Sequence, residues 1–530
     1  MATKGNTARR PVEEPPDDPP RGGLPPLPAT DNGPGAAESP EPHRVVSLSR
    51  KAAGAYYTPD SVTVSLIRWV VRSERDRMLD PACGDGRFIS RHWNSVGIEK
   101  DVAAARQAAG RAGNALVHNA DFFAWAEQTT ERFDCAAGNP PFIRYQTFKS
   151  EARARALALC ADAGVVFSGL TSSWAPFLVV AASLLKRGGR VAFVVPAEIG
   201  HAPYAAPALE YFVQSFSTVQ IIAVRKKLFP NLSEDCWLLY ADNFGGKASE
   251  ILFSVLDVFC PTATPPAPQL KLSLFEWRRI WRRRLRPLLI PTSARELYQH
   301  VAERPDTKRL SDLASVGIGY VTGGNDFFHL RPSQAEALDL PSSLLQPTVR
   351  NSRYLLGDCL TVDAVSRWQR ADEPVLLLHI PKELAKLPRS VNLYLESAAG
   401  QQARSSYKCL HRNPWYSVPD VHVPEFFLTY LSGRRVGLVR NQARITCTNA
   451  LHYVRLRDGQ SASNLVQAWQ SPFTQLSCEL EGHPLGGGVL KLEPREASAV
   501  LLPSATAKAQ IDEREVAAAI ATMQSWRHYC

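Results

Sequence analysis

Short apolar runs alternate with stretches of helical periodicity between residues 45 and 245, and this alternation constrains the fold more than any other feature. Successive strand–helix–strand units place parallel strands in one sheet with helices on both faces. We therefore predict an α/β fold with a Rossmann-like, mostly parallel sheet of seven strands. The expected strands are Arg77–Asp80, Val96–Glu99, Ala115–His118, Phe133–Ala137, Arg190–Val195, Val219–Val224 and Cys236–Ala241.

The last of these runs differs from the others. No helical stretch separates Cys236–Ala241 from the strand before it, whereas Val102–Arg111 and Trp174–Lys186 are typical crossover helices. Strands joined without a crossover pair antiparallel. We expect an antiparallel hairpin at the edge of the sheet.

Composition divides the rest of the chain. Residues 1–44 are rich in Pro, Gly, Asp and Glu, so they cannot bury enough apolar surface to fold. The stretch 261–268, PTATPPAP, is typical of a linker, and past residue 300 short runs with Gly and Pro turns indicate an α+β domain. We predict a disordered tail at 1–44, a first domain at 45–250, a linker with a basic helix at 251–300, a second domain at 301–504 and a C-terminal helix at 505–530.

Charge and cysteine content narrow the class of protein. A formal net charge of +10 fits a polyanionic partner. The ten cysteines are scattered without metal-ligand spacing, so we expect reduced thiols and no metal site. The most apolar helical run is too short to span a bilayer and no signal peptide is visible, which predicts a soluble, cytoplasmic protein with no membrane partner.

A Gly-rich turn follows the first expected strand, at Asp80-Pro81-Ala82-Cys83-Gly84-Asp85-Gly86. Such a turn lets the backbone approach a nucleotide-like ligand, although a tight structural turn has the same pattern. Glu99 ends the second strand, where a carboxylate can accept hydrogen bonds from ribose hydroxyls. Asp121 follows the third strand and can bind an adenine amine, cap the next helix, or do both.

The sequence Asn139-Pro140-Pro141-Phe142 follows the fourth strand. Two prolines fix the backbone and remove two donors, so the segment presents rigid carbonyl acceptors. An Asn side-chain oxygen beside a carbonyl accepts both hydrogens of one NH₂ group, and an aromatic ring offers a stacking face. Preorganised acceptors of this kind suit methylation of a conjugated amine, because they favour a pyramidal nitrogen with an available lone pair.

These motifs, preceded by Gly54-Ala55-Tyr56-Tyr57-Thr58-Pro59, resemble in order the N6-adenine DNA methyltransferases of the gamma motif arrangement, which serve restriction–modification and related phage-defence systems. The resemblance covers about residues 45–500. It implies that the first domain has the methyltransferase sheet, that the second is a target-recognition domain, and that the cofactor is S-adenosylmethionine. The implied cofactor residues are Tyr57, Thr58, Pro59, Asp80, Pro81, Ala82, Gly84, Glu99, Asp121 and Asn139.

The resemblance also assigns the reaction. Asn139, Pro140, Pro141 and Phe142 would be the catalytic tetrapeptide, with Phe142 where many relatives have Tyr. A flipped base needs both faces covered, so Phe142 and Phe229, from Leu228-Phe229-Pro230, would stack on the adenine. The alternative for Phe229 is a core residue in a loop.

Two further features point to double-stranded DNA as the partner. In Phe275–Arg286 the residues Trp277, Ile280, Trp281 and Leu285 would share one face of a helix. The opposite face, Arg278, Arg279, Arg282, Arg283 and Arg286, would run along phosphates or remain solvated. By resemblance, residues 316–328, 413–416 and 486–492 belong to target recognition.

The sequence thus predicts a site-specific DNA methyltransferase that modifies the N6 amine of a flipped adenine, with a possible separate restriction or defence subunit. Alternatives are an RNA adenine methyltransferase, a protein-glutamine methyltransferase, and a DNA-binding subunit that needs a partner for activity. A second domain of some 200 residues and the Arg cluster disfavour the protein substrate.

Overall fold

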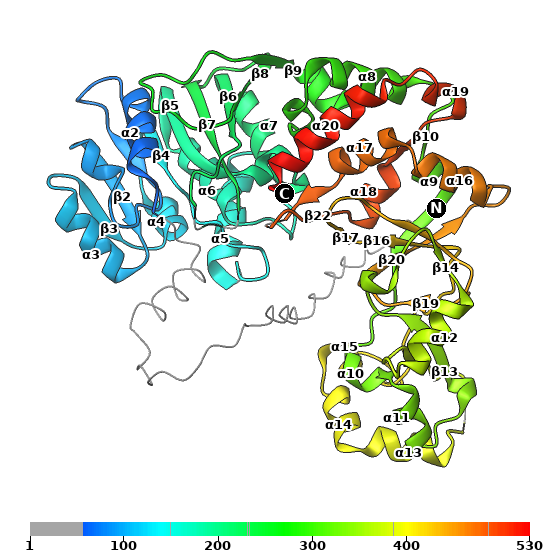
Figure 1. The fold of residues 1–530 in the computed structure, drawn as a ribbon. Helices are drawn as coiled ribbons and strands as arrows, with labels where there is room; N and C mark the ends of the chain where they lie inside the picture. The colour runs from blue at the N-terminus through cyan, green and yellow to red at the C-terminus, as the bar shows by residue number, and fades with distance from the viewer. Residues whose placement is uncertain are drawn as a thin grey trace, which may run out of the picture. The chain divides into compact units, whose positions relative to one another are not determined.

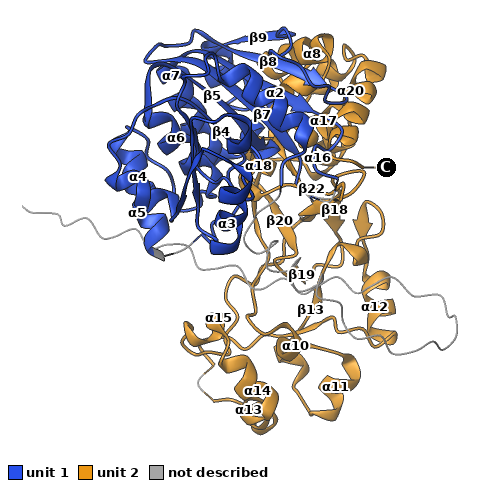
Figure 2. Ribbon diagram, turned by 90° about the vertical axis from the view of Figure 1, so that its left-hand side faces the viewer, with its two compact units in different colours: residues 1–285 blue, residues 286–530 orange. Residues whose placement is uncertain are grey.

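A computed structural model describes residues 57–148, 150–230, 232, 234–384, 386–485 and 487–529. The chain forms two compact units, residues 1–285 and 286–530 (Figure 2). The predicted tail at 1–44 and the residues Gly54, Ala55 and Tyr56 lie outside the described residues. No helix in the described part of the chain is long and apolar enough to cross a membrane.

Unit 1 is built on a nine-stranded sheet of order β3-β2-β1-β4-β5-β7-β6-β8-β9 (Figure 1). The strands are β1 Met78–Asp80, β2 Ser95–Glu99, β3 Leu116–Asn119, β4 Phe133–Gly138, β5 Leu185–Pro196, β6 Phe216–Val224, β7 Cys236–Phe244, β8 Glu250–Leu256 and β9 Leu270–Ser273. Its helices are α2 Asp60–Val70, α3 Val102–Arg111, α4 Phe122–Gln128, α5 Ser150–Asp162, α6 Trp174–Ser183 and α7 Ala206–Ser215. Short helical turns lie at η1 Ile89–Arg91, η2 Ala197–Gly200, η3 Pro203–Ala205 and η4 Glu276–Ile280.

The sheet is mostly parallel, as predicted, but larger than seven strands. Strands β3, β2, β1, β4 and β5 run parallel, and so do β6 and β8. The hairpin strand β7 is antiparallel to β6, as expected, yet it is not at the edge. It also pairs with β5 from Val191↔Ala241 to Pro196↔Cys236, because a strand buried on both faces can be inserted between two parallel neighbours.

The linker prediction for residues 251–300 is wrong over its first part. Strands β8 and β9 extend the sheet, and residues 261–268 connect them. The Gln220 side chain donates a hydrogen bond to the Pro266 carbonyl at 2.8 Å, so this proline-rich loop is docked on the sheet. Pro and Ala dominate the loop because it makes few ladder hydrogen bonds, and composition alone does not separate such a loop from an interdomain linker.

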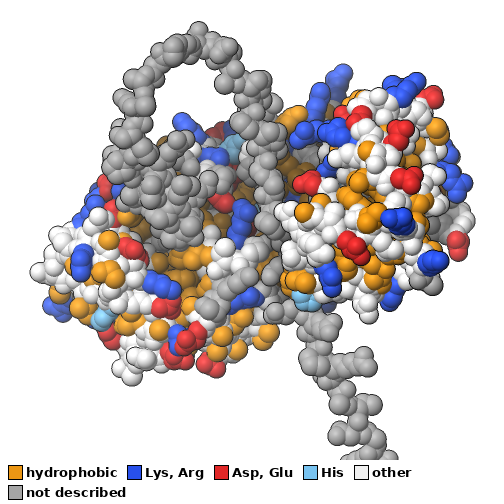
Figure 3. Space-filling view, turned by 90° about the horizontal axis from the view of Figure 1, so that it is seen from below, with side chains coloured by type: hydrophobic (Ala, Val, Ile, Leu, Met, Phe, Trp, Pro, Cys, Tyr) orange, Lys and Arg blue, Asp and Glu red, His pale blue; other side chains and the backbone are white. Residues whose placement is uncertain are grey.

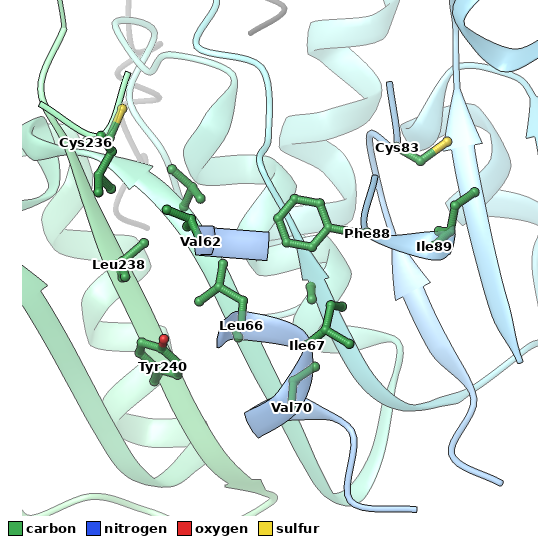
Figure 4. Packing of buried hydrophobic residues seen from close by; sticks show 14 of the residues in the cluster. Val62, Leu66, Ile67, Val70, Cys83, Phe88, Ile89, Cys236, Leu238 and Tyr240 are labelled. Carbon is green, nitrogen blue, oxygen red and sulfur yellow. The ribbon is translucent and has the colours of Figure 1, made fainter. Parts of the chain in front are cut away.

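Apolar packing fixes α2 against the sheet (Figure 4). Val62, Leu66, Ile67 and Val70 recur at helical spacing and are at most 6% exposed. They pack with residues of the Gly-rich turn, of the segment directly after it and of β7, among them Cys83, Phe88, Ile89, Leu238 and Tyr240. This α2–β7 cluster holds the turn after β1 in place, which matters because that turn carries the expected cofactor residues.

Unit 2 combines small, mostly antiparallel sheets with helices. Its two larger sheets have the orders β11-β20-β16-β18-β14 and β12-β15-β13-β19. Its strands are β10 Lys308–Arg309, β11 Ala314–Ile318, β12 His329–Leu330, β13 Leu345–Val349, β14 Cys359–Leu360, β15 Leu376–Leu378, β16 Phe426–Thr429, β17 Leu431–Ser432, β18 Leu438–Asn441, β19 Thr446–Cys447, β20 Leu451–Leu456, β21 His483–Pro484, β22 Leu490–Lys491 and β23 Leu501–Leu502. Its helices and helical turns are η5 Arg286–Leu289, α8 Thr292–Glu303, α9 Leu310–Leu313, α10 Asn325–Phe328, α11 Pro332–Ala337, η6 Ser342–Leu344, η7 Ser352–Tyr354, α12 Val362–Arg370, α13 Arg389–Glu396, α14 Ala398–Arg404, α15 Tyr407–Leu410, α16 Ala462–Trp469, α17 Pro472–Glu481, α18 Pro494–Ala499, α19 Ala505–Lys508 and α20 Glu513–Trp526.

A buried ion cluster joins the C-terminus of the chain to the core of unit 2. The Arg527 guanidinium lies 2.7 Å from the Glu479 carboxylate, and Arg286 lies 3.7 Å from the same carboxylate. All three side chains are nearly inaccessible. The predicted C-terminal helix at 505–530 is two helices, α19 and α20, and α20 packs against α17.

Candidate active site

The Gly-rich turn after β1 is held by its own backbone and by a carboxylate. Gly84 and Gly86 have φ angles of +54° and +85°, a region that other residues rarely adopt. A Cβ atom on Gly86 would also lie 2.8 Å from the Ala108 Cα, so α3 packs directly on the turn. The sequence predicted this turn because only glycine meets both requirements at once.

Glu99 faces the turn from the end of β2. Its carboxylate accepts a hydrogen bond from the Gly84 N–H at 3.0 Å through Oε2, and from the Asp101 N–H at 2.7 Å through Oε1. Each carboxylate oxygen has a further lone pair. Glu99 therefore fixes the Gly-rich turn and retains acceptor capacity toward the carboxyl edge of the sheet.

Asp80 is the most unusual carboxylate of the described residues. It is 1% exposed, its Oδ1 accepts from the Ala82 N–H at 3.1 Å, and its Oδ2 has no hydrogen-bond partner. Burial raises the pKa of the Asp80 carboxyl to about 8, against the lowering effect of the Ala82 bond, and the Glu99 and Asp85 carboxylates raise it further. A buried acceptor without a partner is costly, so this position suits a cationic ligand group.

Tyr57, Thr58 and Pro59 lie beside the turn, where the resemblance expects them. A Cβ on Gly84 would lie 3.6 Å from the Tyr57 ring. The Arg87 guanidinium lies 5.2 Å from the centre of the Tyr57 ring and donates to the Thr58 carbonyl at 3.1 Å. Pro59 then precedes α2, so the segment and the turn form one wall.

Asp121 caps α4. Its Oδ1 accepts from the Phe123 and Ala124 N–H groups at 3.1 and 3.3 Å, and Lys100 lies 3.5 Å from its Oδ2. The capping role is therefore present. Binding of an adenine amine by the second oxygen stays a prediction.

The predicted tetrapeptide begins where β4 ends beside β1. Met78 pairs with Cys135 and Leu79 with Ala136 in the parallel ladder. A Cβ on Gly138 would lie 2.6 Å from the Asp80 Oδ1. Asn139 therefore directly follows Gly138, the residue at which the end of β4 lies against Asp80 of the Gly-rich turn.

Ser173 holds the tetrapeptide from the start of α6. Its Oγ donates to the Pro141 carbonyl at 2.5 Å and accepts from the Ile143 N–H at 3.0 Å, and its own N–H donates to the Ile143 carbonyl at 2.9 Å. The residue is fully buried and occupies the N-cap position of α6 without capping that helix. Sequence reasoning missed Ser173, because a serine before an apolar helix is typical of a cap.

The two expected stacking residues belong to one apolar cluster. Phe229 is 6% exposed within the α2–β7 cluster, and Phe142 is partly buried against that cluster. The high burial of Phe229 agrees with the core alternative. Its stacking on a substrate base stays a prediction.

The predicted basic helix is wrong. Between Phe275 and Leu285 the named helical element is the π-helix turn Glu276–Ile280, and Arg282 and Arg283 have φ angles of 52° and 62°. Trp277, Trp281 and Leu285 are buried, whereas Ile280, predicted on the same face, is only partly buried.

The five arginines therefore do not share one face. Arg278 lies 2.5 Å and Arg283 3.8 Å from Glu210, and Arg286 is 2% exposed beside Glu479. Arg286 cannot reach a phosphate and is withdrawn from the DNA set. Arg279 and Arg282 are exposed and remain candidates.

The segments expected to serve target recognition are largely architectural. Tyr320 is 1% exposed, and its hydroxyl lies 2.9 Å from the His329 Nε2 and 2.7 Å from the Thr348 Oγ1. Trp415 packs on Phe327, with ring centres 5.7 Å apart. These residues build the core around β12 and β15, and base-reading residues are not identified by them.

Comparison with known families covers both units. The profile of N-6 DNA methylases matches residues 44–116, that of Eco57I restriction-modification methylases residues 86–229, and that of the C-terminal domain of the type II methyltransferase M.Eco57I residues 283–527. The chain is 18% identical over 482 residues to type II methyltransferase M.AccI of Acinetobacter calcoaceticus, covering 84% of each chain. It is 26% identical over 196 residues to type II methyltransferase M.CvrRI of Paramecium bursaria Chlorella virus XZ-6E, covering 35% of this chain and 47% of that one.

Two solved structures share parts of the arrangement. The type IIL restriction-modification enzyme MmeI, in complex with DNA, has a TM-score of 0.48 and 13% identity over 87% of this chain and 66% of its own. The type IIG restriction endonuclease BpuSI has a TM-score of 0.42 and 16% identity over 91% of this chain and 62% of its own.

Proposed function

Because this chain belongs to the N6-adenine DNA methylases of the Eco57I restriction–modification type, we propose that its unit 1 transfers a methyl group to the N6 amine of an adenine that has left the DNA stack. The observation that carries the proposal is the junction of β1 and β4. There Gly138, which directly precedes the tetrapeptide bonded to Ser173, lies against Asp80, whose buried Oδ2 has no hydrogen-bond partner.

The family implies S-adenosylmethionine as methyl donor, and the residues of the turn fit it. The Asp80 Oδ2 suits the methionine ammonium, the Glu99 carboxylate suits the ribose hydroxyls, and the Asp121 Oδ2 suits the adenine amine. Small residues at Ala82 and Gly84 leave room for close approach of the ligand. The cofactor, when bound, supplies an electrophilic methyl group on a sulfonium.

The tetrapeptide acts on the substrate amine. The Asn139 side-chain oxygen and the Pro140 carbonyl would accept its two hydrogens, which favours a pyramidal nitrogen and returns the lone pair for in-line attack. The Phe142 ring would stack on the adenine, and it has no hydroxyl to contribute. The N6 proton then leaves to solvent, since none of the four tetrapeptide side chains is a base.

Transfer of labelled methyl groups from S-adenosylmethionine to unmodified plasmid DNA tests this function. We expect label in N6-methyladenine, and we expect that label to be lost in Asn139→Ala. Label on RNA or protein instead would favour the corresponding alternative. Bound cofactor without any transfer would indicate a chain that needs a partner subunit.

A further inference from the structure

An exposed apolar loop leads into the residue that clamps the tetrapeptide. Residues 163–170, Ala-Gly-Val-Val-Phe-Ser-Gly-Leu, follow α5 and contain no charged side chain. Val166 is 82% exposed and Leu170 is 48% exposed. On the face seen in Figure 3, which is the side on which α5 lies in Figure 1, hydrophobic side chains lie in the open among Lys and Arg.

Both ends of this loop are fixed although its apolar side chains are exposed. Val165 is buried, and its N–H donates to the Cys160 carbonyl at 2.8 Å. Thr171 is 1% exposed, and its hydroxyl donates to the Ser168 carbonyl at 2.9 Å. The Arg153 side chain donates to the Gly169 carbonyl. The loop therefore has a defined conformation, and this conformation holds Val166 and Leu170 exposed on the surface.

The position of the loop relative to the tetrapeptide follows from Ser173. Ser173 is bonded to Pro141 and Ile143 on both sides of Phe142, and Leu170 is three residues before it in the chain. Leu170 is thus three residues from the side chain that holds the segment around Phe142, on which the substrate base would stack, and Val166 precedes it in the same loop. Apolar side chains can insert between stacked bases and cover their faces, whereas they offer phosphates neither charge nor hydrogen bonds.

We propose that Val166 and Leu170 enter the duplex beside the target adenine and cover the base faces exposed when that adenine leaves the stack. This inference rests on the proposed function. Extruding a base costs a few kcal/mol of stacking and pairing, and an apolar wedge lowers that cost by replacing the lost stacking contact. The partner of the loop is therefore duplex DNA at the target step.

The test uses the full chain carrying Val166→Ser with Leu170→Ser, and duplexes with the methylation site mapped from plasmid DNA. One duplex has a normal target pair, and the other has an abasic site opposite the target adenine, so that extrusion is already cheap. We expect kcat/KM to fall at least tenfold on the normal duplex and by less than threefold on the abasic one. The variant Leu116→Ser is the matched control, since Leu116 is 47% exposed at the opposite, amino end of a strand.

The outcomes separate the two proposals. Equal losses on both duplexes, or no loss on either, would overturn the wedge while wild-type methylation still stands. A change in sedimentation with transfer unaffected would assign the loop to a protein contact instead. A wild-type chain that methylates no DNA would remove the proposed function, and the wedge with it.

Discussion

Replacing Asp80 with asparagine separates the stability cost of the buried carboxylate from its use in binding. The unfolded carboxyl has a pKa of 3.8 and the folded one a pKa of about 8, because burial penalises its charge. Between these values the folded chain holds a proton that the unfolded chain has released. The contribution of the protonated Asp80 carboxyl to the free energy of unfolding is therefore fully present below pH 3.8 and is lost as the pH rises toward 8.

The size of this effect follows from proton linkage. A single group of this kind lowers the free energy of unfolding by up to about 1.4 kcal/mol per pH unit, or about 2 to 3 kcal/mol from pH 5 to pH 7. Asp80→Asn removes this contribution, and its amide oxygen can still accept from the Ala82 N–H. The difference in unfolding free energy between variant and wild type should shift in favour of the variant by that amount over the interval.

Urea unfolding at pH 5, 6 and 7 measures the effect, with hydrogen exchange of β1 and β4 peptides following unit 1 by itself. Binding should respond in the opposite sense, because a cofactor ammonium requires the ionised carboxylate. Wild-type affinity for S-adenosylmethionine should rise by up to about tenfold from pH 6 to pH 7, and Asp80→Asn should bind weakly with no such slope. Parallel pH dependences of stability in the two proteins would refute the reasoning.

The remaining predictions concern separate contacts. Ser173→Ala should lower the single-turnover rate constant of methyl transfer about tenfold or more at unchanged cofactor affinity, because the Pro141 carbonyl and the Ile143 N–H lose their partner. Ser173→Thr should restore most of that rate. A fall in cofactor affinity in Ser173→Ala would contradict the positioning role. Glu99→Gln should weaken S-adenosylmethionine binding about 10- to 100-fold by calorimetry, through loss of charge-assisted bonds, and unchanged affinity would exclude Glu99 from the site. Arg279→Ala with Arg282→Ala should reduce the slope of log K against log salt by about 2 for duplex DNA, and an unchanged slope would place both away from phosphates. Arg527→Met should destabilise unit 2 by about 3 to 5 kcal/mol in urea, because Glu479 would stay buried without its closest partner, and a change below about 1 kcal/mol would refute that.

Local patterns in the sequence were sufficient to predict the residues around the Gly-rich turn. Gly84 and Gly86 can be identified because their backbone conformation requires glycine, and Glu99 because a carboxylate ends the next strand a short distance along the chain. The parallel direction of the strands around β1 and β4 agrees with the same alternation, which predicts a mostly parallel sheet and not the order of its strands.

Contacts between distant segments could not be predicted in this way. The bonds of Ser173 to Pro141 and Ile143 span about thirty residues, and its sequence context is that of an ordinary helix cap. Arg278 and Arg286 fit an amphipathic helix by periodicity, yet their partners, Glu210 and Glu479, lie far away in the chain. The insertion of β7 between β5 and β6 is likewise a long-range pairing that periodicity does not encode.

The central claim is that the tetrapeptide methylates the N6 amine of adenine in DNA at one sequence. The most direct test is nucleoside mass spectrometry, with modified-base sequencing, of DNA from methylation-deficient bacteria that express the chain or its Asn139→Ala variant. We expect N6-methyladenine at a single sequence motif with the wild type and none with the variant. Methylation of cytosine instead, or N6-methyladenine that persists in Asn139→Ala, would contradict the account.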